Sequence, residues 1–300
     1  MITVAIIAYG DEDVERVVKE VLSQKTDLKI DLIVVWDLPP KKSVGRVRKY
    51  CRVFVRRKRL GKSSAVKLAA SKARGKVVFL VPADVFLSSN CIEEMTRVFM
   101  EDPRCGVVWA KPTPLNARQN LFTMCWSLIH ELNNRVAEAL DAVGALAFAS
   151  GELIAVRKEL ALSIPNWIIN DDSYIALTAA RKGFKIRLSR VRVGNLAPTT
   201  FREYIAQRAR WQYGNIQVKR VIGEAPTTFL ASIRNPLVIR EIIKFLLESP
   251  KRILTMFTSI LLEAIVAIKT LKILKVQERL EEVWPIILTS KKGGGLVYLF

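Results

Sequence analysis

A regular alternation of short apolar runs and helical patterns, over about the first 110 residues, most constrains the fold of this chain. Residues 2–8 are apolar without a break, which is typical of a strand buried on both faces of a sheet. The next segment carries apolar residues at helical spacing, namely Val14, Val17, Val18, Val21 and Leu22. Further strands are predicted at 31–36, 53–55, 76–81 and 106–110, and further helices at 62–73 and 90–100. This rhythm predicts an α/β fold with a doubly wound, mostly parallel sheet and helices on both faces.

The second half of the chain has longer helical patterns. Its predicted elements are a helix over 118–140, a bent pair of strands over 146–157, a helix over 172–182 and a strand over 184–188. The bend of the strand pair is expected at Gly151. Thr200 and Glu203 then have the spacing of a capping box, which predicts the start of another helix.

The last quarter of the chain is basic and amphipathic. Residues 253–268 form an apolar run of sixteen residues that only Glu263 interrupts, with lysine and arginine on both sides. A bilayer-spanning helix needs about 20 apolar residues, so the run fits a marginal span or an interfacial helix. A helical cap packed on the preceding domain is the alternative. We expect a main domain at 1–223, a helical segment at 224–290 and a flexible tail at 291–300.

Charge and cysteine content limit the possible functions. The chain has 48 Lys and Arg against 28 Asp and Glu, a net charge of +20, which suggests an anionic partner such as nucleic acid, a lipid surface or a phosphorylated substrate. Its four cysteines lie far apart, and His130 is the only histidine. A zinc site, a histidine-based triad and a disulfide scaffold are therefore not expected.

Acidic residues at the ends of predicted elements are the first candidates for chemistry. Asp37 follows the second strand, Asp84 follows the fourth, and Asp171 and Asp172 open a helix. Ligands of such sheets bind beyond the carboxyl ends of the strands. Carboxylates placed there suit the binding of a nucleotide, the binding of a divalent cation on a diphosphate, and the acceptance of a proton. Taken singly, each aspartate is more often a turn former or a helix cap.

A polar and aromatic set follows in the helix after Thr200. Gln207, Arg210 and Trp211 are spaced i, i+3 and i+4, so they share one helix face. An aromatic ring with two polar side chains can hold a sugar or its phosphate. Taken alone, Trp211 is more often a core residue and Arg210 an ordinary ion-pair partner.

The ordered set resembles the family-2 inverting glycosyltransferases of the GT-A fold, and most of all the branch with cellulose, hyaluronan and chitin synthases and ceramide glucosyltransferase. That branch has three spaced aspartates followed by Q-x-x-R-W, and the matching residues are Asp37, Asp84, Asp172 and QRARW at 207–211. AYGD at 8–11 resembles the family's A-Y-N-E, and GKSSAVKLA at 61–69 resembles G-K-x-x-A-x-N. SGELIAVRKEL and DDSYIALTAARKG are similar to two further family segments. The resemblance covers about residues 1–217.

The resemblance implies roles for individual residues. Asp172 would be the catalytic base. The nucleotide sugar would be bound by Ala8, Tyr9, Asp11, Asp37, Lys62 and Asp84. The acceptor and the diphosphate would be contacted by Asp171, Gln207, Arg210 and Trp211. Asp84 would also bind Mg²⁺ or Mn²⁺, although Pro82 replaces the first carboxylate of the family's D-x-D motif. Ceramide glucosyltransferase-like members need only one aspartate here.

The function that the resemblance implies is transfer of a hexose from a nucleoside-diphosphate sugar to a lipid-linked or polysaccharide acceptor. The enzyme would work at the cytoplasmic face of a membrane, as a peripheral protein or with a single marginal span, and its basic segments would contact anionic lipids. Nucleic acid is not expected as a partner. Two alternatives are a non-catalytic nucleotide-binding relative, suggested by Pro82, and a basic nucleic-acid-binding protein, suggested by the net charge. The second alternative has no use for three aspartates.

Overall fold

The computed structural model describes residues 1–10, 13–224 and 235–276. These residues form two compact units. The first unit consists of residues 1–112 and 147–194, and the second of residues 113–146 and the described chain from Asn195 onward. Asp11 and the tail predicted at 291–300 lie outside the described residues. The domain boundaries predicted from the sequence stay predictions.

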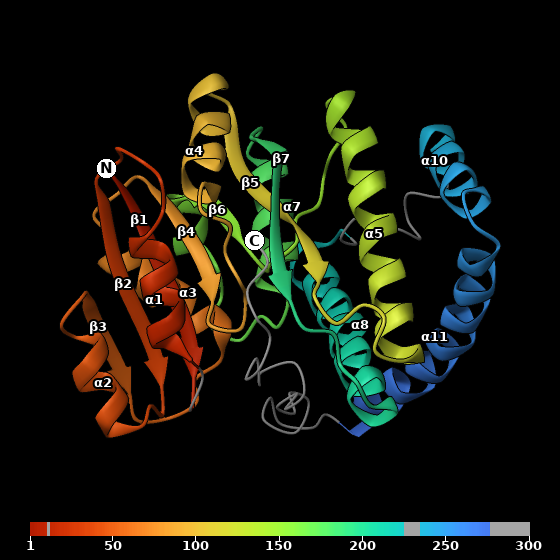
Figure 1. Ribbon diagram of the computed structural model, residues 1–300, viewed down its shortest axis with the longest axis horizontal. Coiled ribbons are helices and arrows are strands. Elements are labelled where there is room, and N and C mark those ends of the chain that lie inside the picture. The colour runs from red at the N-terminus through yellow and green to blue at the C-terminus, as the bar shows by residue number, and fades with distance from the viewer. Residues whose placement is uncertain (11–12, 225–234, 277–300) are drawn as a thin grey trace. The chain divides into compact units, whose positions relative to one another are not determined.

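The first unit is built on a seven-stranded sheet with the strand order β3-β2-β1-β4-β6-β5-β7. The strands are β1 (Ile2–Tyr9), β2 (Ile30–Asp37), β3 (Arg52–Arg56), β4 (Val77–Pro82), β5 (Cys105–Pro114), β6 (Ile154–Arg157) and β7 (Lys185–Asn195). The strands β1, β2, β3 and β4 pair in parallel, whereas β6 is antiparallel to both β4 and β5. Figure 1 shows the parallel strands running in one direction. The predicted α/β fold with a mostly parallel sheet is confirmed.

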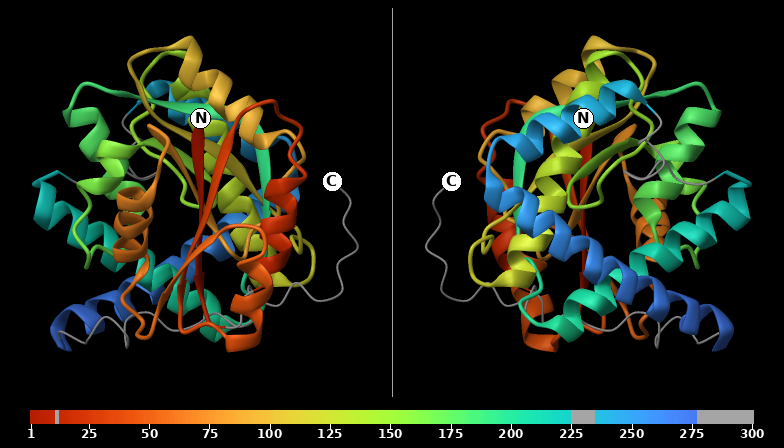
Figure 2. Two further views of the ribbon diagram at one scale, coloured as in Figure 1. Left: turned by 90° about the vertical axis from the view of Figure 1, so that its left-hand side faces the viewer. Right: turned by 90° about the vertical axis from the view of Figure 1, so that its right-hand side faces the viewer.

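Helices cover both faces of this sheet. They are α1 (Val14–Leu22), α2 (Lys41–Val47), α3 (Lys62–Lys72), α4 (Cys91–Glu101), α6 (Lys158–Leu162) and α7 (Asp171–Arg181). Val4 and Ile6 of β1 share one apolar cluster with Val17 of α1 and Ile92 of α4. The left view of Figure 2 shows α1, in red, and α3, in orange, on opposite sides of β1 and β2. The apolar runs of the sequence are therefore strands buried on both faces.

The predicted bent pair of strands at 146–157 is wrong in its first half. Only Ile154–Arg157 is a strand, and residues 145–150 have no regular structure. Phe148 is buried without a strand ladder, and its ring lies 5.7 Å from that of Trp109. The apolar residues of this segment fill the core from an irregular backbone, so their pattern resembled that of a strand.

The direction of β6 decides which segments meet at one edge of the sheet. The parallel strands β1, β2, β3 and β4 place their carboxyl ends at the same edge. Because β6 is antiparallel to β4, the segment before Ile154 enters the sheet from that edge. The turns after β1, β2 and β4 and the loop with Gly151 therefore gather there. We call this edge the carboxyl edge.

The second unit is helical, with α5 (Leu121–Ala142), α8 (Phe201–Ile222), α10 (Pro236–Leu247) and α11 (Pro250–Val276). α11 packs on α8 and α5, and α10 packs on α5. Thr200 caps α8 as predicted, because its hydroxyl accepts the N–H of Glu203 at 3.3 Å. α5 begins at Asn120, which forms a capping box with Thr123 that the sequence analysis missed. Among the described helices, α11 alone has a stretch, Pro250–Lys275, that is long and apolar enough to cross a membrane.

Candidate active site

The turn after β1 is fastened to the end of β2. The Gly10 N–H donates to the carbonyl of Asp37 at 2.8 Å, and the indole N–H of Trp36 donates to the Gly10 carbonyl at 2.9 Å. Gly10 has a φ of +65°, in the left-handed region that favours glycine. Tyr9 lies against Arg59, whose guanidinium carbon is 4.6 Å from the ring centroid. These contacts place Tyr9, a predicted donor-binding residue, at the carboxyl edge beside a cationic loop.

The AYGD segment also contains Ala8 and Asp11, two further residues predicted to bind the nucleotide sugar. Ala8 is buried, and its methyl group belongs to the apolar cluster of the core. A donor could therefore reach only the backbone of Ala8. Asp11 lies outside the described residues, so its predicted contact with the nucleotide stays a prediction.

Asp37 is buried and bound by an arginine. The strand register places Asp37 beside Arg56, and both of its carboxylate oxygens contact that guanidinium, with Oδ2 at 2.8 Å from Nη2. Oδ2 also accepts the N–H of Leu60 at 3.0 Å. Arg56 further donates to the hydroxyl of Ser64 at 2.8 Å and to the carbonyl of Gly61 at 3.1 Å. Asp37 thus fixes the loop that leads into α3. The sequence analysis missed Arg56, although it follows the strand beside Asp37.

A cluster of one lysine and two aspartates forms where α3 and α7 begin. Lys62 is the first residue of α3, and Asp171 and Asp172 are the first two residues of α7. The Ser63 hydroxyl ties the two helix starts together by donating to the carbonyl of Ile168 at 2.5 Å. Lys62 Nζ lies 3.1 Å from Asp171 Oδ1. The structure brings Lys62 together with two other predicted site residues, Asp171 and Asp172, that come much later in the sequence. We call Lys62, Asp171 and Asp172 the acidic cluster.

Gly151 lies directly against the acidic cluster. A Cβ atom at this position would stand 3.0 Å from Asp172 Oδ2 and 3.1 Å from Lys62 Nζ. The Lys62 ammonium also donates to the Gly151 carbonyl at 3.4 Å. A side chain at residue 151 would therefore press on the Asp172 carboxylate and the Lys62 ammonium, and glycine avoids that contact.

The surroundings of Asp172 shift the pKa of its carboxyl group upward. Burial and the nearby charge of Asp171 raise the pKa of Asp172 to about 6, while Lys62 lowers it. Burial also acts to lower the pKa of Lys62, but the charges of Asp171 and Asp172 prevail, and the net shift is upward. The lysine therefore stays charged near neutral pH. A carboxylate that titrates near pH 6 can accept a proton from a hydroxyl group at pH 7.

The Q-x-x-R-W residues lie on α8, in the second unit. The ring of Trp211 packs against Trp126 and His130 of α5, with centroid distances of 4.9 and 5.9 Å. The ring of Tyr204 lies 5.9 Å from that of Trp126. Trp211 is therefore part of an aromatic cluster between α5 and α8, which we call the aromatic cluster. His130 is buried in it.

Arg208, the residue after Gln207, joins this motif to α11. Arg208 Nε donates to Glu263 Oε1 at 2.6 Å, and the amide of Gln212 donates to Glu263 Oε2 at 3.0 Å. The sequence analysis noted Glu263 only as a break in an apolar run, and it missed Arg208. Gln207 Oε1 is buried and has no hydrogen-bond partner among the described residues. We call Arg208 and Glu263 the α8–α11 ion pair.

The residues at the carboxyl edge fit a family comparison. A family model described as "Glycosyl transferase family 2" matches residues 3–160, which is more than half of the 300 residues. The chain belongs to glycosyl transferase family 2. The match covers Asp37, Lys62 and Asp84 of the first unit, and it ends before Asp171 and Asp172. A comparison of this glycosyltransferase with curated proteins gave no match.

Solved structures show the same fold. A mannosyltransferase, PcManGT from Pyrobaculum calidifontis, in complex with GDP-Man and Mn²⁺, is 19% identical with a TM-score of 0.57, and the match covers 91% of this chain and 80% of that one. Glucosyl-3-phosphoglycerate synthase from Mycobacterium tuberculosis, in complex with Mg²⁺ and UDP, is 17% identical with a TM-score of 0.52. That match covers 73% of this chain and 79% of the other. The glycosyltransferase therefore has the GT-A fold.

Asp84 is the residue to which the sequence analysis assigned a divalent cation. It is half-buried and follows β4 at the carboxyl edge, after Pro82 and Ala83. The described residues contain no group of three or more His, Cys, Asp or Glu side chains that could hold a metal ion. Mg²⁺ is often held by one or two carboxylates and by the phosphates of a substrate. The single carboxylate of Asp84 fits a cation that is shared with a diphosphate.

Proposed function

We propose that this glycosyltransferase moves a hexose from a nucleoside-diphosphate sugar to an acceptor hydroxyl with inversion, and that Asp172 is its general base. The acidic cluster carries this proposal. Asp172 has a pKa of about 6, and its carboxylate lies against Gly151 at the edge where ligands of such sheets bind. Perturbed carboxylates in this kind of place are candidates for catalysis.

The reaction is a single displacement. The acceptor oxygen forms a bond to the anomeric carbon while the bond from that carbon to the diphosphate breaks on the opposite face. The hydroxyl proton passes to the carboxylate of Asp172, and the nucleoside diphosphate leaves with the electron pair of the broken bond. Asp172 suits this step because it is mostly ionised at pH 7 and still basic enough to hold the proton. Lys62 keeps it ionised.

The donor would lie over the carboxyl edge. Its nucleotide would contact Tyr9, Asp11 and the backbone of Ala8, and Asp37 would act there together with Arg56, which binds it. The structural neighbours support a nucleotide donor, since one is a complex with GDP-Man and another a complex with UDP. Lys62 would contact the donor from the start of α3, because its ammonium lies at the carboxyl edge beside the carbonyl of Gly151.

A divalent cation belongs to this proposal. Mn²⁺ and Mg²⁺ are present in the complexes of the two neighbours, and Asp84 offers one carboxylate for such an ion here. The cation, when bound, neutralises charge that develops on the leaving diphosphate. The protein's own part is to hold the carboxylate of Asp84 toward the diphosphate.

We assign the chain to the Q-x-x-R-W branch of the family, with a lipid-linked or polysaccharide acceptor. Gln207, Arg210 and Trp211 would contact the acceptor or the diphosphate, together with Asp171. Support comes from the buried Gln207 Oε1, which lacks a hydrogen bond among the described residues, as a ligand-binding amide would without its ligand. Trp211 would act through its outer face, because its ring also packs in the aromatic cluster.

The acceptor would be reached at a membrane surface. α11 turns one side toward α8 and α5, with Ser259, Val266 and Thr270 buried. Its opposite side exposes large apolar residues: Ile253, Leu254, Phe257, Ile260, Leu261, Ile265, Ile268 and Leu271. Because the α8–α11 ion pair holds the middle of the helix, we propose that α11 lies in the membrane interface rather than spanning it. We place the protein on the cytoplasmic face.

A donor screen tests the proposed activity. We expect one or a few GDP- or UDP-hexoses to raise the melting temperature with Mn²⁺ and to be slowly hydrolysed or transferred to lipid acceptors. Binding without hydrolysis or transfer to any acceptor would favour a non-catalytic relative. Binding of nucleic acid with a steep salt dependence, and of no nucleotide sugar, would overturn the proposal.

Vesicle binding tests the membrane assignment. Leu261→Ser with Phe257→Ser should reduce sedimentation of the full chain with anionic vesicles by about tenfold, because two apolar side chains leave the interface. Met100→Ser, which changes an exposed apolar residue at the end of α4, is the matched control and should have no effect. Equal binding of all three proteins would mean that α11 does not face the membrane.

A further inference from the structure

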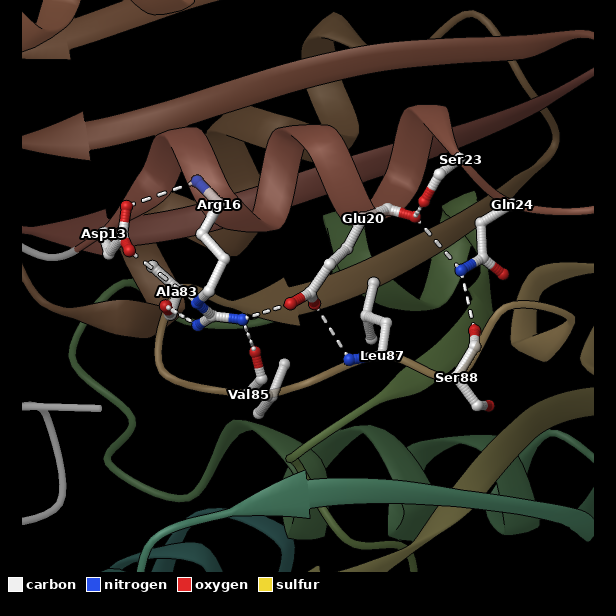
Figure 3. Close-up of polar contacts among 9 residues, drawn as sticks. All are labelled: Asp13, Arg16, Glu20, Ser23, Gln24, Ala83, Val85, Leu87 and Ser88. Atoms are coloured by element: carbon white, nitrogen blue, oxygen red, sulfur yellow. Dashed lines mark hydrogen bonds and ion pairs between the residues drawn. The ribbon is translucent and has the colours of Figure 1, made fainter. Parts of the chain in front are cut away.

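One polar face of α1 is bound to the segment that carries Asp84. Arg16, Glu20 and Gln24 are spaced four residues apart, so they lie on one side of the helix and the turn that follows it. All three reach the backbone of residues 83–88, as Figure 3 shows. No family motif in the sequence covers these three residues, and the proposed reaction gives them no role.

Arg16 holds the backbone on both sides of Asp84. Its guanidinium donates to the carbonyl of Ala83 at 3.3 Å and to that of Val85 at 2.8 Å (Figure 3). Ala83 is also fixed by its N–H, which donates to the carbonyl of Ile7 in β1 at 3.1 Å. The carbonyls of the residues before and after Asp84 are therefore bound to α1, and the N–H of Ala83 is bound to β1.

Arg16 is itself locked in position. It donates to Glu20 Oε1 at 2.7 Å, and its guanidinium carbon lies 4.2 Å from the centroid of the Phe86 ring. Glu20 uses its other oxygen to accept the N–H of Leu87 at 2.9 Å (Figure 3). Phe86 also forms a two-bond bridge with Gly194 at the end of β7, at 2.8 and 2.9 Å. A segment without regular structure is thus held at nearly every residue.

We propose that Arg16 is a positioning residue for the carboxylate of Asp84. This rests on the proposed function, in which that carboxylate binds a cation shared with the donor diphosphate. With Pro82 in place of a second carboxylate, Asp84 is the one carboxylate of this motif, so its direction sets what the motif contributes to the cation site. The planar guanidinium suits this task because it donates to two carbonyls at once, which an ammonium group does not do in a fixed geometry.

The test compares nucleotide affinity with and without Mn²⁺ in the full chain. GDP and UDP are titrated by calorimetry, once with Mn²⁺ and once with EDTA, and the ratio of the two affinities measures the cation site without turnover. Arg16→Gln should reduce that ratio about tenfold and leave the affinity in EDTA unchanged. Arg16→Lys, which keeps the charge, should show the same loss. A residue that only stabilised the fold would alter both affinities together.

Two further variants define the outcome. Arg46→Gln breaks a different ion pair to α1, with Glu15 at 2.8 Å, and should keep the wild-type ratio. Glu20→Gln retains an oxygen for the Leu87 N–H, and it should show a smaller loss; it carries the test if Arg16→Gln does not fold. If Arg16→Gln or Glu20→Gln keeps the wild-type ratio while Asp84→Asn reduces it, the proposal for Arg16 is overturned. The cation assignment to Asp84 then stands. A wild-type protein without any Mn²⁺ effect would overturn the cation assignment as well.

Discussion

The acidic cluster of the first unit and the α8–α11 ion pair of the second unit handle buried charge in opposite ways. Both oxygens of Glu263 are used, by Arg208 at 2.6 Å and by Gln212 at 3.0 Å. In the acidic cluster one ammonium group faces two carboxylates, and the buried Asp171 Oδ2 has no hydrogen-bond partner among the described residues.

The difference separates a structural charge from a reactive one. A carboxylate whose charge is fully matched has little reason to bind a proton, and it serves to join two helices. Burial, and next to it the charge of Asp171, which shares one ammonium group with Asp172, raise the pKa of Asp172 to about 6. The same contrast holds within the first unit, where Asp37 is matched by Arg56.

The largest effect should come from Asp172→Asn. We expect the rate of sugar transfer to fall about a thousandfold, because the general base is lost, with little change in nucleotide affinity. Steady-state rates and calorimetric titration of the nucleotide measure the two quantities. Asp102→Asn removes another Asp–Lys pair, with Lys185 at 2.7 Å, and is the control that should keep the rate. Equal losses of rate and nucleotide affinity would place Asp172 in the donor site instead.

Asp172→Asn should also leave the protein as stable or more stable at pH 8. Because folding raises the pKa of Asp172 from 3.8 to about 6, the folded state binds this proton more tightly than the unfolded state. The carboxylate therefore lowers the stability as the pH rises from about 4 to 6, and its replacement removes that loss. A lower melting temperature of the variant at pH 8 would contradict this account.

In the second unit, Glu263→Gln should act on stability. Removing one partner of a buried ion pair costs about 3–5 kcal/mol, and the pair is partly exposed, so we expect a loss of about 2–3 kcal/mol. Urea unfolding followed by tryptophan fluorescence measures it, because Trp126 and Trp211 pack beside the pair. The double variant Arg208→Met with Glu263→Leu should recover much of the loss. An unchanged midpoint in Glu263→Gln would show that the pair does not join the helices.

Lys62→Met sharpens the comparison by removing the single cation of the acidic cluster. Lys62 lowers the pKa of Asp172, so its loss should raise that pKa and move the acid limb of kcat/KM to higher pH. The pH profile of the variant is compared with that of Lys72→Met, which changes a lysine at the other end of α3. An unmoved acid limb would mean that Lys62 does not set the charge of the base.

The smallest effect is expected for Asp31→Asn, at the opposite edge of the sheet. Asp31 accepts from the Thr3 hydroxyl at 3.0 Å, from Arg52 at 2.7 Å and from the N–H of Arg74 at 3.0 Å, and these contacts lower its pKa against the effect of burial. We expect a loss of about 1–2 kcal/mol in unfolding free energy at pH 7. Since the folded pKa lies below 3.8, the difference should shrink only as the pH falls below about 4. A difference that grows as the pH falls below about 4 would contradict this.

Sequence patterns within about ten residues predicted the strands, helices and caps that depend on neighbouring residues. The strand over 2–8, the helix from Val14 and the cap at Thr200 are present, because strand burial, helix periodicity and capping act within about ten residues. The antiparallel β6 was not predicted, since strand direction depends on how the chain returns to the sheet. The segment with Phe148 was predicted as a strand because of its apolar residues, which are buried, but its backbone has no regular structure.

The sequence predicted individual residues of the candidate site, but it did not predict which of them contact each other. Lys62, Asp171 and Asp172 were all singled out, yet nothing in the spacing shows that Lys62 contacts Asp171 at 3.1 Å. Arg56 and Arg208 were missed because each is defined by a partner on another element, Asp37 and Glu263. Such pairs depend on strand register and helix packing, which a single sequence does not contain.

Some of the partners of α5 come much later in the chain, and this has a consequence for its synthesis. Glu131 of α5 binds Arg252, 121 residues later, at 2.7 Å, and α5 packs on α10 and α11. At about 5–20 residues per second, the ribosome needs roughly 6–24 seconds to supply these partners. During that time the side of α5 that α10 and α11 cover has no helix on it. The nascent chain must therefore pass through an interval in which a chaperone or a membrane surface can capture it before its own C-terminal helices arrive.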